Sequence, residues 1–233
     1  MNKTRSDTDP SPIRILLVDD HPVVRQGLRL LIEAEPDLEI AAEASTARDA
    51  VELAEADPPD VAVIDLALAD RSGLELIKDL KIRVPGLAML VLSMHDESLY
   101  AERALRAGAR GYVMKHEATD TLLNAIRKVH GGEIAVSPKM ATRILNQLVA
   151  GQPAQVTNPV SRLSDRELEV FTLIGQGIGT RQIAERLFLS IKTVEAHREN
   201  IKQKLEIKSG PELTRYAVQY VMEQTKPSGD ASA

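Results

Sequence analysis

The chain has 233 residues, of which 43% are hydrophobic and 27% charged, and it contains no cysteine. This composition is typical of a folded globular protein and excludes disorder throughout, disulfides and thiolate metal sites. The charge is uneven: residues 161–226 carry 11 Lys and Arg against 9 Asp and Glu, whereas residues 1–160 carry 18 against 24, which predicts two parts with different tasks.

The N-terminus is polar and has no apolar stretch of the length that a signal peptide needs. No run of residues approaches the 18 consecutive apolar positions of a transmembrane helix. We therefore expect a cytoplasmic protein with no membrane contact.

Strands and helices are predicted to alternate over the first part of the chain. Short apolar runs predict strands at 13–18, 38–44, 61–65, 88–93 and 111–114. Apolar residues recurring every three or four positions predict helices at 22–35, 47–56, 73–81, 97–107 and 119–129. Such βα units imply a parallel sheet with helices on both faces. We expect an α/β domain at 12–133 with an open five-stranded, doubly wound, flavodoxin-like sheet.

Polar side chains stand where four of these apolar runs end. Asp19 and Asp20 follow the first run, Asp65 ends the third, Ser93 ends the fourth and Lys115 follows the fifth. Because the carboxyl ends of parallel strands meet at one edge of the sheet, we expect these side chains to share a pocket.

This set of residues predicts phosphoryl chemistry. Crowded carboxylates repel one another unless a hard cation such as Mg²⁺ or Mn²⁺ neutralises them, and Mg²⁺ is commonly held together with a substrate phosphate. Asp65 would attack phosphorus to form an aspartyl phosphate, while Lys115 supplies positive charge and Ser93 donates a hydrogen bond. Alternatively, Asp65 only caps the next helix and the acidic pair forms a turn. The joint occurrence favours the phosphoryl site, with His21 as a surface histidine.

The segments LLVDDHPVVRQGL, VAVIDLALADRSGLEL, MLVLSMHD and RAGARGYVMKH resemble the receiver domain of two-component response regulators, over roughly residues 13–131. The resemblance implies that Asp65 is the phosphoacceptor, that Asp20 binds Mg²⁺ directly and Asp19 through water, and that the backbone carbonyl of Ala67 is a further ligand. It also implies that Ser93 and Lys115 contact the phosphoryl group.

Two further positions bear on that resemblance. Tyr112 occupies the place of the receivers' aromatic residue that turns inward on phosphorylation; the alternative is a rim aromatic with no switching role. Receivers usually carry Met-Pro where this chain has Leu68-Ala69. We expect this departure to loosen the loop and alter the lifetime of the phosphate.

The second part of the chain is predicted to be a linker with a short helix, 134–160, and then a small all-α four-helix domain, 161–226. The short helix covers 138–148. Ser164 and Glu167 form a capping box that opens the first helix of the domain, and Ser190 is a good N-cap for a longer helix to Leu205. A short helix, 180–187, lies between them, and a fourth covers 211–222. This spacing fits a helix-turn-helix, but a plain four-helix bundle has the same local pattern.

The stretch LSDRELEVFTLIGQGIGTRQIAERLFLSIKTVEAHRENIKQKLEIKS resembles a LuxR-type DNA-binding domain, with its helix-turn-helix at 180–199. The resemblance implies binding to double-stranded DNA. Candidate phosphate contacts are Lys192, Thr193, Arg198 and Lys202. Candidate base contacts are Glu195, Ala196 and Glu199. Several relatives carry Lys in place of Glu195, so fewer phosphate contacts are expected per subunit, although Glu can accept a hydrogen bond from cytosine.

Together the two parts resemble a response regulator of the NarL/FixJ type. The resemblance implies a sensor histidine kinase as phosphodonor, Mg²⁺ as cofactor, and a homodimer on DNA when the protein is phosphorylated. The last helix is a candidate dimer surface or an internal packing element through the apolar and aromatic residues Leu213, Tyr216, Ala217 and Tyr220.

We expect a transcription regulator and not an enzyme, with two alternatives. A Mg²⁺-dependent aspartyl-phosphate phosphatase of the haloacid dehalogenase type would carry its nucleophile on the first strand and a second Asp two residues later, whereas Asp19 and Asp20 are adjacent. A phosphorylation-independent transcription factor would use the receiver only for dimerisation, which the intact Asp and Lys set disfavours.

Overall fold

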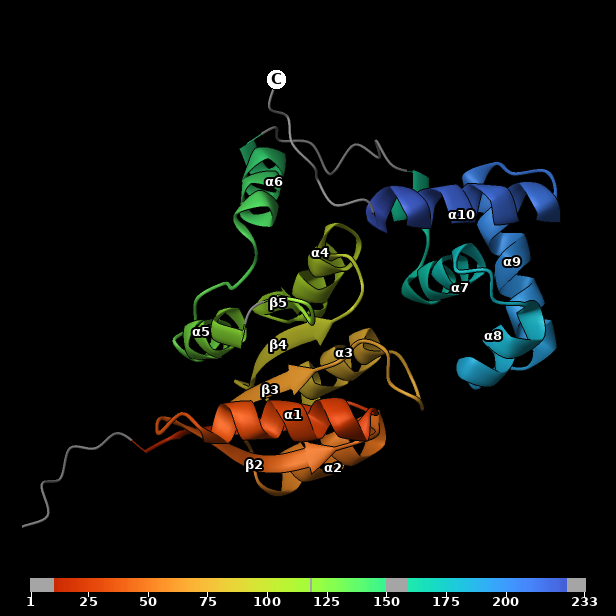
Figure 1. The fold of residues 1–233 in the computed structure, drawn as a ribbon. Coiled ribbons are helices and arrows are strands. Elements are labelled where there is room, and N and C mark those ends of the chain that lie inside the picture. Colours follow the sequence, from red (N-terminus) through yellow and green to blue (C-terminus); the bar gives the residue numbers. More distant parts are fainter. Residues whose placement is uncertain (1–10, 118, 150–158, 226–233) are drawn as a thin grey trace, which may run out of the picture. The chain divides into compact units, whose positions relative to one another are not determined.

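The computed structural model describes residues 11–117, 119–149 and 159–225 (Figure 1). Two compact units are present: residues up to 138, without the loop 69–72, form the first, and residues from 139 onward belong to the second. Within the described ranges, no helix has the length and apolar character needed to cross a membrane. Residues 150–158 of the predicted linker lie outside the described residues.

The first unit is an α/β domain with helices on both faces of a five-stranded parallel sheet, as predicted. The strands lie in the order β2-β1-β3-β4-β5, and α1 and α5 cover the face opposite to α2, α3 and α4 (Figure 1). The strands are β1 (Ile13–Val18), β2 (Leu38–Ala44), β3 (Val61–Ile64), β4 (Ala88–Ser93) and β5 (Gly111–Met114). The helices are α1 (Pro22–Glu33), α2 (Ala47–Ala56), α3 (Gly73–Arg83), α4 (Glu97–Ala107) and α5 (Thr119–His130).

Apolar residues of the central strands bury both faces of this sheet. On one face Ile15, Val63 and Leu90 pack with Ile32 of α1 and Ile126 of α5. All four residues of β3 are buried, as expected for an interior parallel strand. The predicted site residues lie at the carboxyl edge of the sheet. The buried strands fix the geometry of this edge.

Several helix ends differ from the prediction by a few residues. Helix α1 ends at Glu33 and not at position 35, because Glu35 precedes Pro36 and a residue before proline disfavours the helical conformation. Helix α3 continues two residues beyond the predicted end, to Arg83.

The chain after α5 returns along the edge of the sheet. Ala135 pairs with Gly111 in a parallel bridge, and the Tyr112 N–H donates to the Ala135 carbonyl at 2.8 Å. The Ser137 N–H donates to Glu97 Oε1 at 2.8 Å, and its hydroxyl donates to the other oxygen of that carboxylate. This segment is therefore tied both to β5 and to the first turn of α4.

The second unit is helical. It contains α6 (Pro138–Val149), a 3-10 helix (Pro159–Arg162), α7 (Asp165–Gly175), α8 (Thr180–Arg186), α9 (Ile191–Leu205) and α10 (Gly210–Thr225). The predicted caps are present: Ser164 N–H donates to Glu167 Oε2 at 2.7 Å, and the Thr193 N–H donates to Ser190 Oγ at 3.0 Å.

The core of the second unit is built around α7 and α10. The buried Phe171 ring lies 6.0 Å from the Tyr216 ring and 5.5 Å from the Tyr220 ring, centroid to centroid. Leu213, Ala217 and Tyr220 of α10 are buried inside this unit. Their burial favours internal packing over a dimer surface for these three side chains.

Candidate phosphoacceptor pocket and DNA-binding helix

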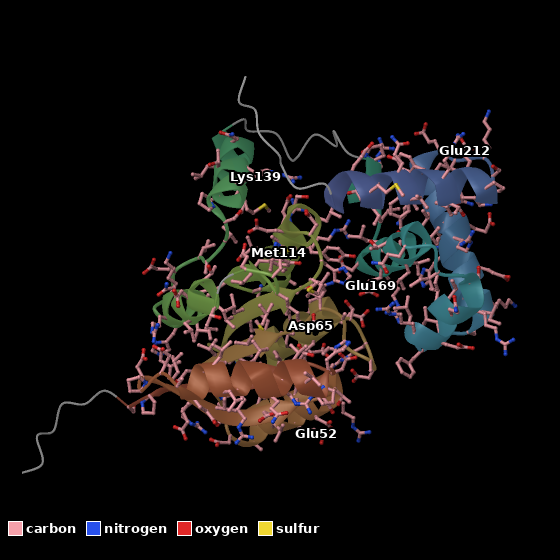
Figure 2. The ribbon with its side chains drawn as sticks, viewed as in Figure 1. Glu52, Asp65, Met114, Lys139, Glu169 and Glu212 are labelled. Carbon is pink, nitrogen blue, oxygen red and sulfur yellow. The ribbon has the colours of Figure 1, made fainter. Side chains whose placement is uncertain are left out.

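Three predicted site residues each follow the last residue of a strand, and each donates a backbone hydrogen bond to a neighbouring strand or its end. These bonds place the three residues at the carboxyl edge of the sheet. Asp19 N–H donates to the Ala44 carbonyl at 3.2 Å, Asp65 N–H to the Val18 carbonyl at 2.9 Å, and Lys115 N–H to the Ser93 carbonyl at 2.9 Å. In Figure 2, Asp65 is labelled beside the end of β3, and the labelled Met114 immediately precedes Lys115. Asp19, Asp65 and Lys115 are thus positioned by strands and not by free loops.

Lys115 joins two of the carboxylates. Its Nζ lies 2.6 Å from Asp65 Oδ2 and 2.7 Å from Asp19 Oδ2. The side chains are exposed by only 10% for Lys115, 4% for Asp65 and 2% for Asp19, so these are buried ion pairs. Burial lowers the pKa of Lys115, but the charge of Asp65 and the hydrogen bonds to both carboxylates outweigh it, and the pKa is raised. The lysine is therefore a cation at neutral pH.

Asp20 and His21 complete an acidic cluster. One ligand atom each from Asp19, Asp20, His21 and Asp65 lies within 4.8 Å of all the others. His21 Nδ1 lies 2.6 Å from Asp20 Oδ1, and this buried oxygen has no other polar partner among the described residues. Burial raises the pKa of Asp20, and the charge of His21 opposes that effect. A divalent cation would neutralise these clustered carboxylates and take this oxygen as a ligand, so the residues fit a Mg²⁺ site.

Ser93, Ala67 and Tyr112 lie around this cluster. The Ala67 N–H donates to Asp65 Oδ1 at 3.3 Å, which places this residue beside the carboxylate. The fully buried Ser93 accepts a hydrogen bond from the His95 N–H at 3.2 Å, and the Tyr112 hydroxyl donates to the His95 carbonyl at 2.7 Å. Burial raises the pKa of Tyr112 well above its ordinary value. Tyr112 is thus inside the domain and not at its rim, while its switching role stays a prediction.

Two residues of the site were not predicted from the sequence. His21 is exposed on its outer side, as expected, but its ring contacts the acidic pair; its place directly after Asp20 is the signal that indicates this. Gly73 begins α3 so close to the acceptor that a Cβ atom there would lie 2.4 Å from the Asp65 carbonyl oxygen. A glycine eight residues after Asp65, at the start of a predicted helix, was the available signal.

Helix α9 presents a stripe of exposed residues along one side. Lys192, Glu195, Ala196 and Glu199 are exposed, while Val194 and Ile201 on the opposite side are buried. The predicted phosphate contacts Thr193, Arg198 and Lys202 are half-buried and flank the stripe. The exposed side chains of this stripe are therefore accessible to a ligand of α9.

Helices α8 and α9 are joined by a tight turn. Phe188 in that turn adopts φ +52°, a left-handed conformation that is rare for a bulky side chain, and it is exposed. Lys202 Nζ lies 2.8 Å from Glu199 Oε1, and the hydroxyls of Ser190 and Thr193 lie 2.7 Å apart. Two helices joined by a short turn are the elements of a helix-turn-helix, so α8 and α9 match this motif.

Comparison with known proteins assigns both units. Residues 15–127 match the family described as response regulator receiver domain, and residues 161–217 match the family described as bacterial regulatory proteins, luxR family. The oxygen regulatory protein NreC of Staphylococcus carnosus (strain TM300) is 40% identical over 210 residues, which cover 88% of this chain and 97% of the relative. The NreC protein of Staphylococcus aureus (strain JH9) is 39% identical over the same shares.

Solved structures of response regulators are similar along the chain. RcsB from Salmonella enterica serovar Typhimurium, bound to promoter rprA in the presence of the phosphomimetic BeF3−, is 26% identical with a TM-score of 0.62, covering 89% of this chain and 99% of RcsB. A LuxR-family two-component response regulator from Aurantimonas sp. SI85-9A1 is 39% identical with a TM-score of 0.55, covering 60% and 99%. The chain belongs to the NarL/FixJ-type two-component response regulators and is a DNA-binding transcription regulator with a receiver domain and a LuxR-type domain.

Proposed function

We propose that Asp65 accepts a phosphoryl group from a sensor histidine kinase or a small phosphodonor, and that this modification controls dimerisation and DNA binding. The observation that carries the proposal is the buried contact of Lys115 with both Asp65 and Asp19, beside the Asp20 carboxylate. A buried cation and three clustered carboxylates form a site for a metal ion and a dianionic group.

In the proposed step, an Asp65 carboxylate oxygen forms a bond to phosphorus while the bond from phosphorus to the donor breaks. The donor's imidazole nitrogen, or the acyl oxygen of a small donor, leaves with the electron pair. An ionised carboxylate needs no general base for this attack. Lys115 offsets the negative charge on the phosphoryl oxygens, and the Ser93 hydroxyl donates a hydrogen bond to one of them.

The carboxylates of Asp19, Asp20 and Asp65 and the backbone carbonyl of Ala67 would hold Mg²⁺. The bound ion would supply positive charge to the transferring group and to the carboxylates. A cation bound here would explain why this edge of the sheet tolerates three acidic side chains.

The response would pass from Ser93 to Tyr112 through one residue. Ser93 and Tyr112 bond the amide and the carbonyl of His95, respectively, so a shift of the Ser93 hydroxyl toward phosphate would alter both contacts. Such a shift would change the relative populations of two receiver conformations.

The output of the proposed switch is α9 bound in the DNA major groove. Lys192, Thr193, Arg198 and Lys202 would contact phosphates, and Glu195, Ala196 and Glu199 would face base edges. We propose domain limits of 12–133 for the receiver, 134–160 for the linker and 161–226 for the DNA-binding domain. The promoter-bound state of RcsB supports this proposal, as does the exposure of the α9 stripe. Binding as a homodimer would double the few phosphate contacts of one subunit.

Replacement of the acceptor tests the first step. Wild-type protein incubated with acetyl phosphate and Mg²⁺ is expected to gain one phosphoryl group per chain, and Asp65→Asn none, because an amide is a poor nucleophile. The measurement is intact mass together with gel retardation of the phosphoprotein. Asp49→Asn on the exposed surface of α2 is the matched control and should be labelled like the wild type. Stoichiometric labelling of Asp65→Asn would refute the assignment.

Charge removal on α9 tests the second step. Lys192→Ala and Arg198→Ala should each weaken DNA binding on all sequences and reduce the slope of log affinity against log salt by about 1, since one phosphate contact is lost. Binding is measured by fluorescence anisotropy at several salt concentrations. Arg215→Ala on the exposed surface of α10, outside the helix-turn-helix, serves as control. A slope unchanged in both α9 variants would argue against this helix as the contact surface.

A further inference from the structure

The exposed stripe of α9 carries two carboxylates in the part of the helix that a helix-turn-helix directs at base pairs. Glu195 and Glu199 are four residues apart, so they lie on the same side of the helix, and both are exposed. N-terminal residues of the second helix approach base edges in this motif. Acidic side chains in that position face a polyanion, which calls for a specific compensating interaction.

The two glutamates differ in their surroundings. Glu199 is neutralised within its own helix, because Lys202 Nζ lies 2.8 Å from Glu199 Oε1. Among the described residues, the Glu195 side chain has neither an ion pair nor a hydrogen bond. Glu195 therefore brings an uncompensated charge to a DNA surface.

The major groove offers few hydrogen-bond donors that the Glu195 carboxylate could accept from. A carboxylate at neutral pH only accepts hydrogen bonds, and the groove offers donors only at cytosine N4 and adenine N6. Guanine O6 and N7 and thymine O4 are acceptors and would repel it. Adenine N6 lies between two acceptors, its own N7 and O4 of the paired thymine, whereas cytosine N4 has an acceptor, guanine O6, on one side only. Cytosine is thus the base whose edge fits a carboxylate best.

We infer that Glu195 determines sequence specificity by accepting a hydrogen bond from a cytosine amino group in each half-site of the operator. The inference rests on the proposed binding of α9 in the major groove and specifies what that helix reads. Because Lys202 already neutralises Glu199, removal of Glu195 should change the base preference more than removal of Glu199.

The test is selection of binding sites from a pool of random double-stranded DNA by the full-length protein, incubated with acetyl phosphate and Mg²⁺. The wild type is expected to enrich sites with a C·G pair at one fixed position of each half-site. Changing that cytosine should weaken binding by about tenfold, the usual effect of one lost base contact. Glu195→Ala should bind all four bases at that position within about twofold. Glu195→Gln should shift the preference from cytosine toward adenine, whose N6 and N7 suit an amide.

Control variants distinguish recognition of a particular base by Glu195 from a general effect of charge on DNA affinity. Glu223→Ala removes an exposed carboxylate of α10 and should leave the selected sequence unchanged. Lys192→Ala should weaken binding at every sequence without altering the preferred base. Since Glu195→Gln keeps the size of the side chain, a changed preference in this variant is not an effect of misfolding.

Two results would overturn the inference: the same cytosine enriched by Glu195→Ala, or no cytosine position in the wild-type sites that depends on Glu195. Either result leaves DNA binding by α9 intact. If the wild type retains no DNA from the pool at low salt, the proposed function fails as well, so the two failures are distinguishable.

Discussion

The phosphoacceptor pocket and helix α9 are built in opposite ways. In the pocket, Asp19, Asp65 and Lys115 come from distant parts of the sequence, are buried, and depend on one another for charge balance. On α9, the candidate DNA contacts lie within 11 consecutive positions, from Lys192 to Lys202, and each of them is exposed or half-buried. A buried charge is costly without its partner, whereas an exposed charge acts only when a ligand arrives. Substitutions in the pocket should therefore alter folding and function together, and those on α9 binding alone.

Removal of the buried lysine is expected to have the largest effect. Lys115→Met leaves two buried carboxylates without their cation, so the free energy of unfolding should fall by about 3 kcal/mol in the presence of a chelator. The measurement is urea unfolding of full-length protein with EDTA. Mg²⁺ should restore more stability to the variant than to the wild type, because the ion neutralises the same carboxylates.

Lys128→Met on the exposed side of α5 is the control for that experiment and should be close to neutral. If Lys115→Met and the wild type are equally stable under chelation, the charges of the pocket do not depend on one another for stability, and the contrast with α9 fails.

A methyl group added at Gly73 is expected to have a smaller but clear effect. The Cβ atom would lie 2.4 Å from the Asp65 carbonyl oxygen and 2.7 Å from Leu66 Cα, so backbone must move. Gly73→Ala should cost about 1–3 kcal/mol in stability and slow labelling of Asp65 by acetyl phosphate. Gly27→Ala in α1 is the matched control: its Cβ meets nothing within 4 Å, and it should stabilise the helix slightly. Equal effects of the two substitutions would show that the close approach is unimportant.

The smallest expected effect concerns Glu167, a carboxylate of the DNA-binding unit that is buried like those of the pocket. Glu167 Oε2 accepts hydrogen bonds from Lys204 Nζ at 2.6 Å and from the Ser164 N–H at 2.7 Å. Burial raises the pKa of Glu167, but these hydrogen bonds outweigh it and the pKa is lowered. Because its pKa is lowered in the folded state, ionised Glu167 stabilises the protein at pH values above its ordinary pKa of 4.5. This stabilisation is lost as the pH falls through the pKa of the folded state.

Glu167→Gln should therefore lower stability by about 1 kcal/mol at pH 7 and reduce the additional loss on acidification below pH 4.5. Thermal unfolding of full-length protein at pH 7 and in a series below pH 4.5 measures both effects. Glu223→Gln, exposed on α10, is the control. A variant that loses as much stability on acidification as the wild type would exclude this ionisation as a source of the pH dependence.

The sequence predicted most of the fold because apolar periodicity alone distinguishes these strands and helices. The ends of β1, β2, β4 and β5 agree with the prediction, and helix ends differ by a few residues where proline or a cap decides. Convergence of Asp19, Asp65 and Lys115 also follows from topology, since parallel strands end at one edge.

Side-chain geometry was beyond prediction from the sequence. The sharing of Lys115 between two carboxylates, the contact of His21 with Asp20 and the burial of Tyr112 depend on rotamers and on the loops that follow the strands. The half-buried state of Arg198 and Lys202 depends on how α9 packs against α7 and α8. Such details arise from tertiary packing, which no local pattern encodes.

The most direct test of the central claim is to locate the phosphoryl group itself. Wild-type protein is incubated with acetyl phosphate and Mg²⁺, the acyl phosphate is reduced with borohydride, and the modified residue is identified by peptide mass spectrometry. The account predicts modification at Asp65 alone, and none when Mg²⁺ is removed by chelation. Modification at Asp19 or Asp20 with Asp65 unmodified, or labelling that is indifferent to the metal, would contradict it.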